Sequence, residues 1–91
     1  MPTIIYRRAE DVLHSPIGND IVALRVDGGR CFGMEDVTAE VWRLLEAPAS
    51  IEQLCDQLIE RYQVDRPTCL AEVSRLIISM VAEGLVEPVK A

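Results

Sequence analysis

Three cysteines and one histidine are the residues of this chain best suited to metal binding, disulfide formation or acid–base chemistry. Cys31, Cys55 and Cys69 are odd in number and widely spaced, which matches neither a disulfide framework nor a zinc site. We therefore expect reduced, structural thiols, no metal and no cofactor. His14 lies in a predicted strand with no fixed partner, so we do not expect it to act as a general base.

The glycine-rich segment 28–33 also has to be weighed as a phosphate-binding loop. It reads Gly-Gly-Arg-Cys-Phe-Gly, but it joins two predicted strands and is not followed by a Lys-Ser or Lys-Thr pair. The segment therefore predicts a turn rather than a nucleotide site. With no converging set of titratable residues elsewhere, we do not expect an enzyme.

Composition limits the partners. The 91 residues are 49% hydrophobic and 26% charged, which is typical of one compact domain spanning residues 1–91. The net charge of −6 argues against nucleic acid and anionic membranes as partners. No apolar run approaches the ~18–20 residues of a membrane span, and no signal peptide is evident, so we expect a cytoplasmic protein. Residues 1–34 sum to zero charge, which makes this third the less repulsive surface for an acidic ligand.

The elements that would position a site begin with strands. Short apolar runs separated by turn formers predict strands before residue 35, with an extended arm over residues 1–9 and a first strand near residues 12–15. Residues 21–26 and 31–34 flank Asp-Gly-Gly-Arg, which predicts a hairpin. Whether the two-residue loop is Asp27-Gly28 or Gly28-Gly29, the same side chains of the two strands share a face of the sheet. Phe32 and Met34 then share a face with Ala23, and Cys31 and Gly33 share the other with Leu24.

Three helices follow the hairpin. The first is expected to begin at Asp36, capped by that carboxylate, and to stop at Ala47-Pro48. The second opens with a capping box of Ser50 and Gln53. The third is expected to start at Asp65-Arg66-Pro67 and to end before Gly84, with residues 85–87 extended and 88–91 as a tail. The expected apolar stripe of the first helix is Val37, Val41, Trp42, Leu44 and Leu45.

The third helix has an unusually wide apolar surface. Its apolar arc approaches ~240°, against the ~100° that a surface helix needs. Either this helix is central and packed on two sides, or one of its flanks forms the floor of an apolar groove.

This order of elements predicts an α+β, winged-helix-like domain with an N-terminal three-stranded antiparallel β-sheet followed by a three-helix bundle. Within it, several segments resemble the PqqD-like family, the leader-peptide chaperones or recognition elements of ribosomally made, modified peptides. The resemblance covers residues 10–87 approximately and differs from the common pattern at Cys31, often an aromatic residue, and at Met34-Glu35, often Leu-Asn. The matching segments are Gly29-Arg30-Cys31-Phe32-Gly33-Met34, Val41-Trp42-Arg43-Leu44-Leu45, Ser50-Ile51-Glu52-Gln53-Leu54, Leu58-Ile59-Glu60-Arg61-Tyr62 and Val81-Ala82-Glu83-Gly84-Leu85-Val86.

The resemblance implies a noncatalytic adaptor that binds the leader of a precursor peptide and presents it to a modifying enzyme or leader peptidase. The free-standing chain is more similar to lasso-peptide leader-binding proteins than to the chaperone of quinone-cofactor biosynthesis. In the family the leader adds as a strand beside the third strand, in the cleft between that strand and the third helix. By position, the expected peptide-binding residues are Arg30, Cys31, Phe32, Gly33 and Met34 of the strand and Ala71, Arg75, Ile78 and Ala82 of the helix, with the flank of Leu76 and Ser79 as the alternative.

The residues also support strand addition directly, because an edge strand offers unpaired backbone groups to an incoming peptide. Backbone N–H groups alternate between the neighbouring strand and the open edge. We expect the N–H of Cys31 to point outward, since Phe32 is also a candidate core residue.

Two other functions fit the same outline. A winged helix can be a DNA-binding regulator, but the predicted third helix offers Arg75 flanked by Glu72 and Glu83 instead of a basic face. The wide apolar flank could instead be closed by a second copy of the chain in a homodimer.

Overall fold

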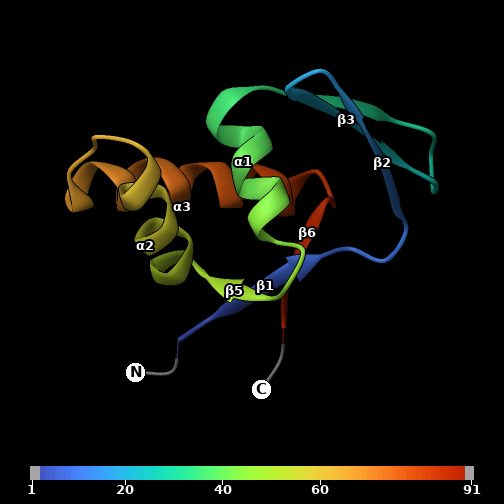
Figure 1. The fold of residues 1–91 in the computed structure, drawn as a ribbon. Coiled ribbons are helices and arrows are strands. Elements are labelled where there is room, and N and C mark those ends of the chain that lie inside the picture. Colours follow the sequence, from blue (N-terminus) through green and yellow to red (C-terminus); the bar gives the residue numbers. More distant parts are fainter. Residues whose placement is uncertain (1–2, 90–91) are drawn as a thin grey trace.

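The computed structural model describes residues 3–89 and has an α+β architecture, as predicted. Three helices lie beside a three-stranded antiparallel sheet, and a second small sheet lies below the first helix (Figure 1). Within the described residues no helix is long and apolar enough to cross a membrane.

The first sheet is a meander of three consecutive strands, β2 (Val12–Ile17), β3 (Asp20–Arg25) and β4 (Cys31–Met34). Ala23 pairs with Phe32 and Leu24 with Cys31, so the predicted facing of the hairpin is confirmed. The turn needs glycine because Gly28 and Gly29 adopt φ of 89° and 66°, a region that other residues rarely enter.

The helices are α1 (Asp36–Leu44), α2 (Ile51–Arg61) and α3 (Arg66–Ala82). The capping box predicted for α2 is confirmed, since the Ser50 hydroxyl accepts from the Gln53 N–H while the Gln53 side chain accepts from the Ser50 N–H. At α3 the Asp65 carboxylate accepts from the Thr68 N–H. Gly84 follows the end of α3 with φ of 77°, as expected of a residue that ends a helix.

The expectation for the start of α1 was wrong in two details. Asp36 does not cap the helix: it is the first helical residue, with φ of 48°, and Glu35 takes the capping position without a side-chain hydrogen bond. Val37 does not join the core, because the second position of α1 faces the surface and leaves 37% of this residue exposed. The buried positions of the predicted stripe are Val41, Trp42 and Leu45.

The second sheet joins three distant segments in the order β5-β1-β6. β1 (Ile5–Arg8) pairs antiparallel with both β5 (Ala49–Ser50) and β6 (Val86–Val89). The segment expected as an extended arm over residues 1–9 is extended and contains a paired strand, and residues 88 and 89 of the expected tail belong to β6. Residues 1–2 and 90–91 lie outside the described part of the chain.

The Arg8 side chain links this sheet to the C-terminal end of α1 by hydrogen bonds. Its guanidinium donates two hydrogen bonds to the Trp42 carbonyl, at 2.6 and 3.1 Å, and lies 4.7 Å from the centre of the Trp42 ring. Burial lowers the pKa of Arg8, and the nearby Glu46 carboxylate partly opposes this effect. His14 packs edge-on against the same ring with centroids 5.6 Å apart. The Arg8 cation thus adds donors to a carbonyl in the last turn of α1, which also accepts from the Leu45 N–H at 3.2 Å.

Candidate functional site

β4 forms an open edge of the meander sheet, because among residues 3–89 it pairs with β3 alone. The backbone N–H of Arg25 donates to the carbonyl of Arg30 at 2.9 Å. Since donors alternate along a strand, the register makes Phe32 point its N–H toward β3, while Cys31 and Gly33 point theirs outward. Two backbone donors of β4 are thus directed to the open edge, and Cys31 is one of them, as predicted.

The opposite edge of the same sheet differs. The N–H of Val26 donates to the carbonyl of Asp11, which places the N–H groups of alternate β3 residues toward β2. By the same alternation Val12, His14 and Pro16 of β2 face outward, and proline has no N–H to offer. β2 therefore also has two outward donors, but Pro16 interrupts its row, whereas the outward positions of β4 all carry an N–H.

A groove of about 360 Å³ runs beside this edge, between β4 and α3. Its floor contains apolar side chains that are almost fully buried, such as Met34, Met80 and Leu85. Its polar groups include the Thr38 hydroxyl on α1, the Ser79 hydroxyl on α3 and the Glu83 carboxylate. The complete lining is Cys31, Phe32, Gly33, Met34, Thr38, Leu76, Ser79, Met80, Glu83 and Leu85.

The structure brings four of the predicted strand residues together with one flank of α3, namely the flank given as the alternative. Leu76 and Ser79 line the groove, and Arg75 lines the adjoining depression with Glu72, Leu76 and Ser79. Arg30 precedes the groove, with its guanidinium 5.1 Å from the centre of the Phe32 ring. In this way the strand residues and one face of the helix form a single concave surface.

The favoured helix residues Ala71, Ile78 and Ala82 are exposed and do not line this groove. Helix phase explains the difference. Met80 faces the core, and at 100° per residue the other three positions lie about 160–180° away from it, on the outer side of α3. Leu76 lies only about 40° from Met80 and so reaches the groove. The groove residues that the sequence did not suggest are Thr38, Met80, Glu83 and Leu85, of which Met80 and Glu83 could have been found from this phase.

The chemistry of the groove is that of a binding surface. Within residues 3–89 no group of three or more His, Cys, Asp or Glu side chains lies close enough together to hold a metal ion. Cys31 is exposed, whereas Cys55 and Cys69 are buried away from the groove. Burial, together with the neighbouring Cys69 thiol, raises the pKa of Cys55 to about 12. What the groove offers is backbone donors, an apolar floor and a few hydroxyls.

Comparison with known proteins gives one matching family and two solved structures of similar fold. The solved structure "TbiB1 in Complex with the TbiA(beta) Leader Peptide" superposes with a TM-score of 0.86 at 26% identity, covering 93% of this chain and 99% of that one. The structure "Lasso peptide synthetase B1 complexed with the leader peptide" superposes with a TM-score of 0.79 at 21% identity, covering 91% and 98%, and supports the fold alone. No curated protein matches the chain. The profile described as "Coenzyme PQQ synthesis protein D (PqqD)" matches residues 20–86, and this chain is therefore a member of the PqqD family.

Proposed function

We propose that this protein binds the leader region of a ribosomally made precursor peptide and presents it to a modifying enzyme or leader peptidase of natural-product biosynthesis. The leader adds as a fourth strand to the edge of β4 and seats apolar side chains in the groove beside α3. The observation that carries this proposal is the open edge of β4, with the outward N–H groups of Cys31 and Gly33, beside an apolar groove. The protein itself is a noncatalytic adaptor that acts in the cytoplasm.

Two guanidinium groups beside the groove support a leader with acidic residues near Arg30 and Arg75, while the Glu83 carboxylate in the lining disfavours acidic residues next to it. Arg75 and Arg30 form no ion pair among residues 3–89, and both lie next to groove residues. A carboxylate on the leader would gain a partner at either guanidinium. Leu76 and Ser79 are the helix residues that we propose to contact the peptide.

We propose lasso-peptide biosynthesis as the pathway, because the chain resembles the leader-binding proteins of that pathway. The relative with the higher structural similarity is bound to a TbiA(beta) leader peptide and is covered over 99% of its length. The alternative is the chaperone role in quinone-cofactor biosynthesis suggested by the family description. The neighbouring genes distinguish the two: a short precursor beside a transglutaminase-like protease and an asparagine-synthetase-like enzyme indicates a lasso-peptide pathway.

Direct binding is the test. The leader half of the precursor encoded beside the gene, labelled with fluorescein, should bind with a Kd of about 10 µM or lower in an anisotropy titration. The unlabelled core half of the same precursor should fail to compete. Absence of saturable leader binding up to about 1 mM would contradict the proposal. Duplex DNA serves as the second control, since the outer face of α3 has too few cations to bind phosphates.

A further inference from the structure

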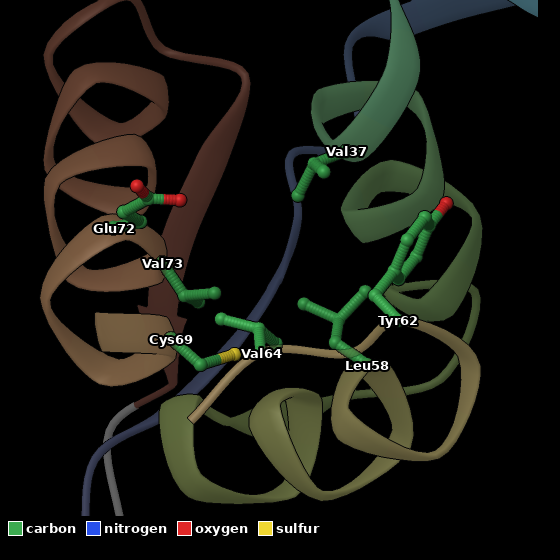
Figure 2. Close-up of a pocket in the computed structure, with 7 residues that line it drawn as sticks. All are labelled: Val37, Leu58, Tyr62, Val64, Cys69, Glu72 and Val73. Carbon is green, nitrogen blue, oxygen red and sulfur yellow. The ribbon is translucent and has the colours of Figure 1, made fainter. Parts of the chain in front are cut away.

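A second pocket lies at the junction of the three helices, apart from the floor of the groove. It has a volume of about 100 Å³ and is lined by side chains from α1, α2, the loop after α2, and α3. Figure 2 shows most of these side chains pointing toward a common centre, with the Tyr62 ring at the margin and directed away from it. They are Val37, Leu58, Tyr62, Val64, Cys69, Glu72 and Val73.

This pocket is apolar and open to the surface. Leu58, Cys69 and Val73 form a buried base, while Val37 and Tyr62 at the rim are 37% and 42% exposed. Such exposure at the rim gives an incoming side chain access to the base. The one charged group in the lining is the Glu72 carboxylate, which forms no ion pair within residues 3–89.

The pocket is continuous with the groove along one flank of α3. Glu72 lines both the pocket and the depression that follows it, and that depression shares Leu76 and Ser79 with the groove. On α1, Val37 lines the pocket and its neighbour Thr38 lines the groove. The pocket, the depression and the groove therefore adjoin one another along one flank of α3, within reach of one extended peptide.

Length and volume indicate what the pocket can hold. Cys69 and Ser79 are ten residues apart on α3, which corresponds to about 15 Å of helix or four to five residues of extended peptide. A volume of about 100 Å³ is too small for a typical ligand site of ~300 Å³ or more. It is suited to one aliphatic side chain, given that a cavity of about 150 Å³ accepts a benzene ring.

We infer that the leader peptide has a second anchor, a Leu-, Ile- or Val-sized side chain that fills this pocket about four to five residues beyond the segment paired with β4. The inference rests on the proposed function and adds a specificity determinant to it. A basic leader residue next to this anchor would face Glu72. Two linked anchors on one peptide bind more tightly than either alone, because the second contact forms at high effective concentration.

Val37→Glu tests the second anchor. The substitution places a carboxylate at the rim of the pocket, and an acidic residue in the first turn of α1 is compatible with the helix. Val81→Glu is the matched control, because Val81 is also 37% exposed but lines none of the three surfaces described here. Circular dichroism would establish that both variants are folded.

The readout is leader binding with full-length and truncated peptides. Val37→Glu should weaken the full-length leader about tenfold and leave a peptide trimmed to the β4-paired segment unchanged, while Val81→Glu should affect neither. Equal binding of every leader length by wild type and Val37→Glu would overturn the second anchor. That result would leave the proposed function intact, since the wild-type protein would still bind the leader.

Methyl NMR gives a second, independent readout. Leu58 and Val64 line the pocket and not the groove, so their methyl signals should shift with the full-length leader and not with the trimmed peptide. Shifts that appear on raising the protein concentration without peptide would assign the pocket to a second copy of the chain and overturn the inference. Absence of shifts at any leader length would overturn it as well.

Discussion

The two sheets of this small domain are built from opposite kinds of contact. The meander sheet joins consecutive strands through short turns and leaves β4 as an open edge. The second sheet pairs β1 with residues 43–45 positions away in β5 and 78–84 positions away in β6, and Arg8 links it to α1 by hydrogen bonds. The two sheets therefore have different roles. The second sheet joins the N-terminal and C-terminal strands of the domain, and the meander sheet supplies the edge that we propose to bind the leader. Substitutions in the two sheets should then affect different measurements.

Phe32→Pro should give the largest loss of stability. The inward N–H of Phe32 pairs with β3 and its ring packs against the core, so proline removes a ladder hydrogen bond and a part-buried aromatic ring together. We expect a loss of about 3 kcal/mol or more in the free energy of unfolding. Urea titration followed by the fluorescence of the buried Trp42 measures it. A variant as stable as wild type would show that the register is different.

Arg8→Ala should destabilise the second sheet without affecting the binding edge. The substitution leaves the Trp42 carbonyl without its two side-chain donors, which should cost about 1–2 kcal/mol. Arg7→Ala is the control, because in the described part of the chain the Arg7 side chain makes a single, exposed ion pair with Glu87, and its loss should cost less than about 1 kcal/mol. Both variants should bind the leader like wild type. A tenfold loss of leader binding in Arg8→Ala would contradict the claim that the second sheet affects stability and not binding.

Ser50→Ala should have a smaller effect of the same kind. Ser50 lies in β5 and caps α2, and the alanine variant loses the acceptor for the Gln53 N–H. We expect about 1 kcal/mol of destabilisation in urea titration. The exposed Ser15→Ala on β2 should change stability by less than about 0.5 kcal/mol. Equal effects of the two substitutions would argue against the capping box.

The thiols should distinguish the open edge of β4, which carries Cys31, from the helical core, which holds Cys55 and Cys69. Cys31 at the open edge should react with Ellman's reagent in the folded protein, while buried Cys55, whose pKa is raised to about 12, should react only on unfolding. The unfolded chain releases the Cys55 proton near pH 9 and the folded chain near pH 12, so unfolding should become easier as pH rises between these values. Rapid labelling of all three cysteines in the native protein would contradict the burial of Cys55 and Cys69.

The parts of the fold that the sequence predicted well depend on local chemistry. The hairpin facing of Phe32 follows from an even-numbered turn, and the start of α2 follows from the reciprocal hydrogen bonds of Ser50 and Gln53. The start of α3 likewise follows from the Asp65 side chain, which accepts from the Thr68 N–H, and its end follows from Gly84, whose backbone has a positive φ.

The parts that were missed depend on long-range packing. Pairing of β1 with β6 joins residues 78–84 positions apart, and nothing in the local pattern of Ile5 or Arg8 indicates that partner. On α3 the apolar arc is so wide that composition favours neither flank. Only the tertiary structure, by placing Met80 against the core, shows that Leu76 and not Ile78 faces β4.

Cys31→Pro is the measurement that tests the central claim most directly. Proline removes the outward N–H that the leader would use, and Cys31→Ala is the control that removes the thiol but keeps the N–H. Both variants should fold like wild type by circular dichroism, and Cys31→Pro should bind the labelled leader at least about tenfold more weakly than Cys31→Ala, a difference of about 1.4 kcal/mol. A folded Cys31→Pro that binds the leader as tightly as Cys31→Ala would contradict strand addition at β4.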